Sequence, residues 1–499
     1  MKTNRVIKIF LASSEELEAD RYRFGNLIRK LDNIYEKRGI RIELFEWEDY
    51  DAAYNGMRKQ DEYNERVRAS DMFLALFHKK AGKFTIEEFN IARKAFDEQA
   101  SPKIYTYIKD LEAGESESRE LAEFKRLMLE ELGHYWCRYS NFDTMQLHFV
   151  LQLQMVEATT PIKVEVKESQ VKIGDSTIAD LNNVPFTSEN ATHRELQSRK
   201  EQLDREIGNA ESGGRRGFFG QRSRMTDEEL ANLMEERESV TEQIERQEKA
   251  LVDTAMSIAR MQGGECSPRM RTAAELFEKG EIDKAEAVFK EDDMEADATN
   301  AKLKFDTAAQ PTAELTRNIE QCAGEYMLKA RIVVSGIADE SRYRQAVKLM
   351  STAIDLVSGR LPEETLAEYL FDYAVLLTDT GQQTKALETW ERLSGIYERL
   401  YRKAPQKYAY GYAGVLNNMA VLYSDKGDFD HCLSKYLKAV DIYDWLDREE
   451  PSIYDDDIAR LKNNLGTLYS DRDEYNKALS EFNEAARIRF ELLAKDNDP

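Results

Sequence analysis

The chain has 499 residues, a formal net charge of −23 and a hydrophobic content of 41%. This length exceeds one compact core and suggests about three units of roughly 100–200 residues. The negative charge disfavours nucleic-acid binding, which needs clustered Lys and Arg, and no apolar run reaches the length of a membrane span. The first apolar run is also too short for a signal peptide, and the four cysteines are scattered, so we expect a cytoplasmic protein with free thiols.

Residues 1–157 alternate strand-like and helix-like segments. Short apolar runs typical of buried parallel strands occur at 6–11, 40–47, 72–77 and 103–108, with a short edge strand at 135–138. Amphipathic periodicity predicts helices at 17–34, 86–96, 121–132 and 145–156. Strands that alternate with helices predict a doubly wound parallel α/β sheet, in which ligands bind beyond the carboxyl ends of the strands.

The next two segments differ from this domain in composition. Residues 158–190 mix β-branched alternation with turn residues, which predicts a small hairpin or an extended connector. Residues 191–262 predict two charged amphipathic helices that form an antiparallel hairpin around a short basic island at 213–224. A solvated interhelical loop explains this island better than a nucleic-acid contact.

Residues 263–499 repeat themselves. Segments 373–381, 419–427 and 465–473 share one pattern, and each is followed by a small or slim residue, Ala386, Cys432 and Ala478, at a spacing of 46 residues. Weaker units precede them, one turning at Gly280 and another containing Ala346 and Ala353. The arrangement resembles tetratricopeptide repeats (TPR) with a long period, as in kinesin-light-chain-like arrays. An all-α solenoid with a concave binding surface is therefore expected, with Cys432 at a small-residue packing position.

Polar and aromatic side chains follow the predicted strands of the α/β domain. If the strands are parallel, their carboxyl-end loops meet at one crevice, which is the default ligand site. We expect this crevice to receive Ser13 and Ser14 after the first strand, Trp47 and Tyr50 after the second, and Phe84, Thr85 and Glu88 after the third. The scattered histidines and cysteines predict no metal site.

Four segments of this domain resemble TIR-like domains (Toll/interleukin-1 receptor fold) of bacterial defence proteins. They are 10–14 (FLASS, with Leu17 and Arg21), the pattern Gly56-x3-Gln60-x3-Asn64, 70–77 (SDMFLALF) and 82–92 (GKFTIEEFNIA). The order and spacing of the segments carry the resemblance, which covers about residues 5–157. The domain lacks the Ser-x-x-Trp-Cys stretch of eukaryotic TIR domains.

The resemblance implies a flavodoxin-like fold and cleavage of the N-glycosidic bond of NAD⁺, which releases nicotinamide and leaves ADP-ribose or a cyclised form. NAD⁺ is then the substrate, and no cofactor is implied. The family pattern places the catalytic glutamate at Glu88, while Glu87 is expected to face solvent or help cap the helix. A carboxylate beside the ribose can stabilise the oxocarbenium character that develops as the bond breaks. A glutamate in the first turn of a helix is also explained by the helix dipole alone.

Three of the other site residues, Trp47, Ser13 and Ser14, have two interpretations each. Trp47 is a candidate to stack on a base or to pack beside the second strand, and Ser13 and Ser14 are candidates to contact ribose or phosphate or to cap the helix. Phe84 and Thr85 flank the glutamate and shape its loop. The resemblance further implies activity on self-association through the TIR domains, ordering of the loop at 47–58, and a TPR array that binds a protein partner or trigger in anti-phage immunity. The alternatives are a non-catalytic TIR–TPR signalling scaffold and a nucleoside-processing hydrolase on a similar fold.

Overall fold

The computed structural model describes residues 5–36, 39–45, 59–112, 114–131, 136–156, 164–174, 176–213, 226–262, 266–336, 339–449 and 454–496. The chain divides into two compact units. The first contains Met1–Met155, Ile162–Gly264 and Leu276–Glu281, and the second contains Val156–Pro161, Glu265–Glu275 and Ile282–Pro499. Within the described chain, no helix combines the length and apolarity that a bilayer crossing requires.

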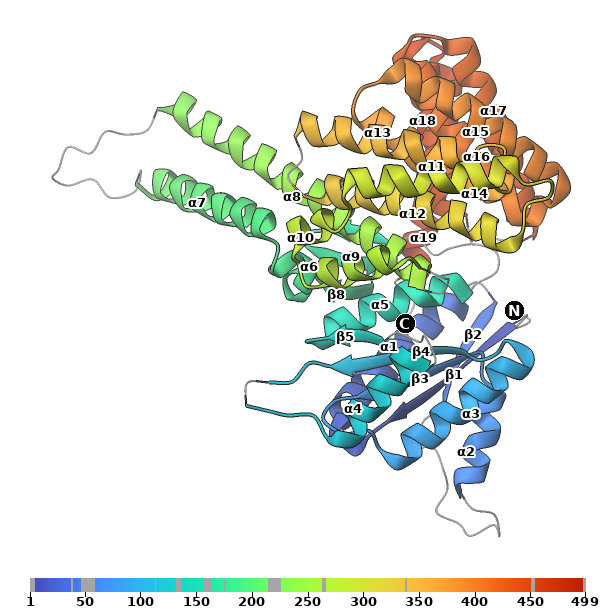
Figure 1. Ribbon diagram of the computed structural model, residues 1–499. Helices are drawn as coiled ribbons and strands as arrows, with labels where there is room; N and C mark the ends of the chain where they lie inside the picture. The colour runs from blue at the N-terminus through green and yellow to red at the C-terminus, as the bar shows by residue number, and fades with distance from the viewer. Residues whose placement is uncertain are drawn as a thin grey trace. The chain divides into compact units, whose positions relative to one another are not determined.

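The first unit begins with an α/β domain that contains a parallel sheet (Figure 1). Its elements in chain order are β1 (Arg5–Ser13), η1 (Glu15–Leu17), α1 (Glu18–Glu36), β2 (Ile40–Phe45), α2 (Lys59–Arg68), β3 (Met72–Phe77), α3 (Lys83–Gln99), β4 (Lys103–Lys109), α4 (Arg119–Arg126), η3 (Leu127–Glu131), β5 (Trp136–Tyr139) and α5 (Phe142–Val156). The predicted parallel sheet and its short edge strand are confirmed. The described part of β2 ends at Phe45, so the predicted positions 46 and 47 lie outside the described residues.

The sheet has the strand order β2-β1-β3-β4-β5, and all its neighbouring pairs are parallel. This is the strand order of flavodoxin-like sheets. The chain places β2 on one side of β1 and β3 on the other side, and this reversal creates a switch point between β1 and β3. Helices α2, α3 and α4 pack on one face over a core that includes Phe73, Phe89 and Phe124. Helices α1 and α5 meet through the edge-to-face pair of Phe24 and Phe149.

The segment Ile162–Gly264 of the first unit forms a small antiparallel sheet followed by a helical arm. Its elements are β6 (Glu165–Lys167), β7 (Gln170–Ile173), β8 (Ser176–Asp180), η4 (Leu181–Asn183), α6 (Pro185–Ser188), α7 (Ala191–Gly213) and α8 (Asp227–Gln262). The apolar cluster of Leu203, Val240 and Ile244 joins α7 to α8. The buried Glu248 carboxylate of α8 accepts hydrogen bonds from the Ser169 hydroxyl, at 2.7 Å, and the His193 ring, at 3.0 Å, and so ties the arm to the small sheet.

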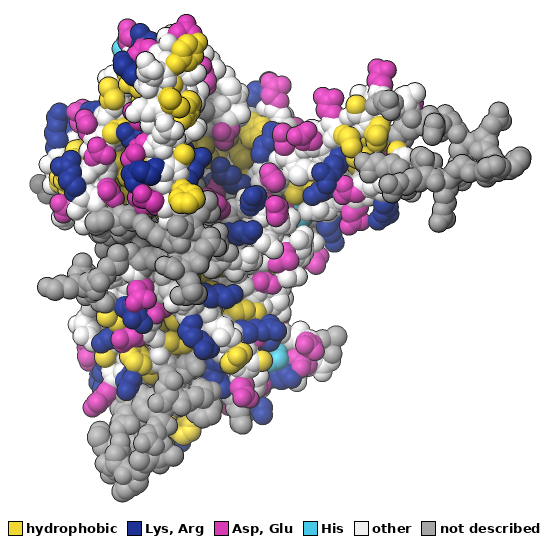
Figure 2. All heavy atoms as spheres, turned by 180° about the vertical axis from the view of Figure 1, so that it is seen from behind, with side chains coloured by type: hydrophobic (Ala, Val, Ile, Leu, Met, Phe, Trp, Pro, Cys, Tyr) yellow, Lys and Arg dark blue, Asp and Glu magenta, His cyan; other side chains and the backbone are white. Residues whose placement is uncertain are grey.

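The remaining elements are helices. They are α9 (Pro268–Glu278), α10 (Ile282–Ala287), α11 (Glu291–Thr307), α12 (Ala313–Ser335), α13 (Glu340–Val357), α14 (Glu363–Asp379), α15 (Gln383–Lys403), α16 (Pro405–Asp425), α17 (Phe429–Glu449), α18 (Asp455–Asp471) and α19 (Tyr475–Asp496). Consecutive helices from α12 onward pack as hairpins (Figure 1). Figure 2 shows acidic and basic side chains interspersed over the face that it draws.

The last three hairpins turn in the same way. Gly381, Gly427 and Asp473 all have positive φ, and each donates its N–H to the carbonyl three residues earlier. The next residue in each case donates to the carbonyl five residues earlier, so all three turns are Schellman motifs at the 46-residue spacing. Ala386, Cys432 and Ala478 are buried, which confirms the helical repeats and the packing role of Cys432.

Candidate functional site

The candidate site lies at the carboxyl edge of the parallel sheet, where β1 and β3 are neighbours. Ser13, the last residue of β1, is in register with Leu76 of β3. The loop after β1 and the loop at 78–82 after β3 therefore leave the same edge side by side. This edge is the switch point at which doubly wound sheets bind ligands.

Glu88 lies in the second turn of α3, because the helix begins at Lys83 and Gly82 is its N-cap. The expectation of a helix that starts at Ile86, with Glu87 and Glu88 in its first turn, is wrong. Gly82 is extended, and its carbonyl already accepts the Ile86 N–H at 3.0 Å, so the helix starts earlier. The first turn of α3 holds no acidic residue, so a favourable charge at the helix N-terminus does not explain Glu88.

The Glu88 side chain is 8% exposed and belongs to the buried stripe of α3. The stripe also contains Thr85, Phe89 and Ala92, at helical spacings of three and four residues. A carboxylate in such a position loses hydration, and this costs free energy unless the site supplies compensating contacts. The burial of this carboxylate makes Glu88 a candidate functional residue.

The neighbouring Glu87 has a structural contact. Its Oε1 atom accepts a hydrogen bond from the side-chain amide of Asn64 on α2, at 3.2 Å, and Asn64 is buried. Glu87 is thus half-buried and links α2 to α3, and it does not cap the helix, whose N-cap is Gly82.

The two serines at the end of β1 are held by α1 and its preceding turn. The Ser13 hydroxyl accepts a hydrogen bond from the buried Arg21 guanidinium at 2.7 Å, and Arg21 also donates to the Ser14 carbonyl at 3.2 Å. The Ser14 hydroxyl donates to the Glu16 carboxylate at 3.3 Å. Both hydroxyls thus lie at the carboxyl edge of the sheet in fixed positions.

The other predicted site residues are placed differently. Thr85 is buried next to Gly82, where a Cβ atom added to Gly82 would lie 3.3 Å from the Thr85 hydroxyl. Phe84 is 58% exposed, so it lies off the buried stripe that contains Glu88. Trp47 and Tyr50 lie outside the described residues.

A buried polar group near this edge was missed by the sequence analysis. The Asp20 carboxylate accepts from Lys109 Nζ at 2.8 Å and from the Tyr139 hydroxyl at 3.0 Å. Burial together with the Asp20 charge raises the pKa of Tyr139 above its ordinary value. The sequence signal that could have indicated this group is that Lys109 and Tyr139 each occupy the last position of a strand.

The loop after β3 is also held by ionic contacts. Glu16 accepts the backbone N–H groups of Lys79 and Lys80, at 3.0 and 3.2 Å. Glu115 pairs with Lys79, and the hydrogen bond from that ammonium keeps the pKa of Glu115 below its usual range. His78 Nε2 lies 3.3 Å from the same carboxylate. The loop that leads into α3 is therefore tied to η1 and to the loop between β4 and α4.

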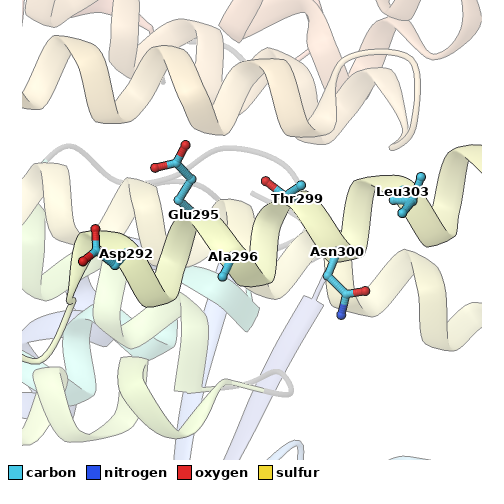
Figure 3. A pocket seen from close by; sticks show the side chains of 6 residues that line it. All are labelled: Asp292, Glu295, Ala296, Thr299, Asn300 and Leu303. Carbon is cyan, nitrogen blue, oxygen red and sulfur yellow. The ribbon is translucent and has the colours of Figure 1, made fainter.

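Among the described residues, neither a metal-ligand cluster nor the hollow of the second unit coincides with the candidate site. Among the described residues, no group of three His, Cys, Asp or Glu side chains is arranged to hold a metal ion. A hollow of about 530 Å³ lies along α11 in the second unit and is lined by Asp292, Glu295, Ala296, Thr299, Asn300 and Leu303 (Figure 3). All six come from one helix, and none is a predicted site residue, so this open hollow assembles no catalytic arrangement.

No protein-family description matches the sequence, and no curated protein matches it. Among solved structures, BtubC (BKLC) from P. vanneervenii is similar with 17% identity and a TM-score of 0.33, over 61% of this chain and 93% of that protein. The apo form of RapI is similar with 16% identity and a TM-score of 0.31, over 59% of this chain and 65% of that protein.

A third structure is a signal transduction ATPase with numerous domains (STAND) and a tetratricopeptide repeat sensor, from Pyrococcus horikoshii. It overlaps with 12% identity and a TM-score of 0.23, over 100% of this chain and 91% of that protein. These TM-scores are too low to carry an argument. The helical repeat array is therefore described from the helices and turns of this chain alone.

Proposed function

We propose that the N-terminal domain is a TIR-type NAD⁺ glycohydrolase or ADP-ribosyl cyclase with Glu88 as its catalytic carboxylate. The observation that carries the proposal is the burial of Glu88 in an otherwise uncharged stripe of α3. The flavodoxin-like strand order and the neighbouring carboxyl ends of β1 and β3 support it, because this is where such sheets bind ligands.

In the proposed reaction the bond between the ribose C1′ and the nicotinamide nitrogen breaks, and its electron pair returns to the pyridine ring. Nicotinamide leaves as a neutral molecule, so no general acid is needed. The Glu88 carboxylate hydrogen-bonds to the ribose hydroxyls and stabilises the positive charge that develops on the sugar. Water then adds to C1′ and loses a proton to give ADP-ribose, or a nitrogen of the adenine attacks C1′ to give a cyclic product.

The matched pair Glu88→Ala and Glu87→Ala tests this assignment. Both changes remove a carboxylate from the same helix, but Glu87 contacts Asn64 in the link to α2. We expect Glu88→Ala to slow nicotinamide release by about a hundredfold or more and Glu87→Ala to keep most of the rate. The measurement is nicotinamide release from NAD⁺ by concentrated full-length protein in a crowded buffer. A Glu88→Ala rate equal to that of the parent chain contradicts the assignment.

The same assay separates the proposal from its alternatives. The proposed enzyme is at rest until its TIR domains associate and is controlled by a protein partner or trigger on the repeat array. A persistent absence of nicotinamide from crowded parent protein favours a non-catalytic scaffold. Release of a free base from nucleosides, with NAD⁺ left intact, favours a nucleoside-processing hydrolase.

A further inference from the structure

His78 is the first residue after β3, at the carboxyl edge of the parallel sheet. Near the end of β3, Leu76 is in register with Ser13, the last residue of β1. His78 therefore lies on the same edge as a serine that is a candidate to contact the substrate. The connection that begins at His78 leads into α3, the helix that contains Glu88.

The imidazole ring of His78 faces a carboxylate from another loop. Its Nε2 atom is buried and lies 3.3 Å from Oε2 of Glu115, in the connection from β4 to α4, although the two atoms lack the geometry of a hydrogen bond. Its Nδ1 atom is not buried and forms no hydrogen bond with the described part of the chain. One ring nitrogen thus faces a carboxylate and the other is available to a proton donor. Catalytic hydrogen bonds are often long in the absence of substrate and shorten when it binds.

Several contacts fix the position of this pair. The Glu115 carboxylate accepts the backbone N–H of Glu112 at 3.0 Å and forms an ion pair with Lys79. The Lys79 carbonyl accepts the backbone N–H of Ser118 at 2.7 Å, so the loop that begins at His78 is bonded to the same connection as Glu115. A carboxylate held in this way can orient an imidazole ring.

The charges around the pair are mainly negative. The hydrogen bond from Lys79 to Glu115 and the charges of Glu115, Glu16 and Glu112 raise the pKa of the Lys79 ammonium. Three carboxylates and one ammonium therefore surround the start of this loop. A proton that the His78 ring takes up during a reaction meets a carboxylate counter-ion in Glu115.

The proposed cleavage of NAD⁺ has two possible outcomes, and they differ in their need for a base. In the route to ADP-ribose, water attacks C1′ and must lose a proton. In the cyclic route, an adenine nitrogen attacks through its lone pair and has no proton to lose. Glu88 stabilises the charge on the sugar in both routes, so a second group that accepts a proton accelerates only the route through water.

We propose that His78 is the general base of the water route and that Glu115 is its positioning residue, an inference that rests on the proposed function of this domain. After nicotinamide has left, the water oxygen bonds to C1′ while one of its protons passes to Nδ1 of His78. The positive charge moves from the sugar to the ring beside Glu115, and the proton then passes to solvent. His78 thereby directs the reaction towards ADP-ribose and away from the cyclic product.

The rates of formation of the two products from NAD⁺, measured with concentrated full-length chains in a crowded buffer, test the role of His78. We expect His78→Gln to lower the rate of ADP-ribose formation about a hundredfold and to raise the fraction of cyclic product. Glu115→Gln keeps the shape of the side chain but removes its charge, and should shift the product ratio in the same direction by a smaller factor. The control is His148→Gln, because His148 lies on α5 and its ring contacts the buried Tyr107 hydroxyl at 3.1 Å. Its product ratio should equal that of the parent chain.

The outcomes separate this inference from the proposed function. A parent chain that releases nicotinamide, together with a His78→Gln variant that keeps the parent rate and product ratio, overturns the role of His78 alone. A parent chain that forms only the cyclic product also overturns it. A parent chain that releases no nicotinamide overturns both this inference and the proposed function.

Added imidazole separates a catalytic role from a structural one. In His78→Ala, free imidazole can occupy the space of the missing ring and accept the proton from water. We expect it to raise the rate of ADP-ribose formation by this variant at least about tenfold, and to leave the rate of Glu88→Ala unchanged. No increase in His78→Ala, or an equal increase in both variants, overturns the assignment of His78 as the general base.

Discussion

Asp20 and Glu88 are both buried carboxylates of the α/β domain. Asp20 accepts hydrogen bonds from Lys109 and Tyr139, which come from the ends of two strands. Its charge is thus compensated by groups at the ends of β4 and β5. Glu88 is buried on the stripe of α3 that also contains Thr85 and Phe89. We assign a structural role to Asp20 and the proposed chemistry to Glu88.

The structural role of Asp20 predicts a large effect on stability. Asp20→Ala leaves Lys109 without its buried partner, and loss of one member of such a pair costs about 3–5 kcal/mol. Asp110→Ala is the control, because Asp110 pairs with Arg138 at the exposed surface and such pairs contribute about 1 kcal/mol or less. Thermal unfolding of the full-length variants measures the difference, and equal midpoints for the two variants contradict the role of Asp20.

The thiols predict a clear pH dependence of labelling. Burial raises the pKa values of Cys266 and Cys322 to about 11, so both are protonated at neutral pH and the thiolate fraction rises as the pH approaches 11. We expect alkylation of these two residues to accelerate about tenfold for each pH unit between 7 and 10. Peptide mass spectrometry after timed alkylation measures the rates, and fast labelling at pH 7 contradicts this expectation.

The residues of the site were predictable from sequence to different degrees. Glu88 could be named as a candidate because its motif is local in the sequence and lies between a predicted strand and a predicted helix. The partners of Asp20 were not, because Lys109 and Tyr139 lie 89 and 119 residues away along the chain and only the parallel strand order brings them together. The start of α3 was misplaced because the extended Gly82 begins the helix before its apolar periodicity is visible.

At the scale of secondary-structure elements, the hairpin repeats depend on small residues where two helices approach closely. Ala374, Ala420 and Gly466 occupy equivalent positions in α14, α16 and α18. A Cβ atom on Gly466 would lie 2.6 Å from the Phe482 ring of α19, which is closer than side chains tolerate. The repeats were predictable because each spacing is local, whereas the closeness of this particular helix pair was not.

This contact predicts opposite effects of the same substitution at two glycines. Gly466→Ala should lower the unfolding midpoint of the array, because the added methyl group forces Phe482 to move. Gly414→Ala, in α16, adds a methyl group with no atom within 4 Å, and should stabilise the helix by about 0.5–1 kcal/mol. Thermal unfolding followed by circular dichroism distinguishes the two, and a stabilised Gly466→Ala variant refutes the close approach.

At the scale of the whole molecule, the division into units does not follow the chain continuously. The segment Leu276–Glu281 belongs to the first unit. The earlier part of α9 and the helices that follow the segment belong to the second unit. Phe277 of this segment is buried and stacks on Phe186 of α6, with ring centroids 5.4 Å apart. The sequence placed Gly280 in a repeat, and nothing in its local pattern indicated the packing of Phe277 on Phe186.

This division predicts which parts of the chain each buried phenylalanine stabilises. Phe277→Ala removes a buried ring from the first unit, at a cost of about 3–5 kcal/mol, and should lower amide protection in α6 and α7. Phe289→Ala removes a buried ring from the second unit and should lower protection in the array instead. Hydrogen exchange measured peptide by peptide checks this, and protection in α6 and α7 that falls equally in both variants contradicts the division.

We propose that the sheet domain breaks the N-glycosidic bond of NAD⁺. Product analysis of NAD⁺ incubated with concentrated, crowded full-length protein tests it most directly. We expect nicotinamide in equal amount to the sum of ADP-ribose and its cyclic form, with all of these products lost in Glu88→Ala. Intact NAD⁺ under these conditions, or the same products from Glu88→Ala at the parent rate, would contradict it.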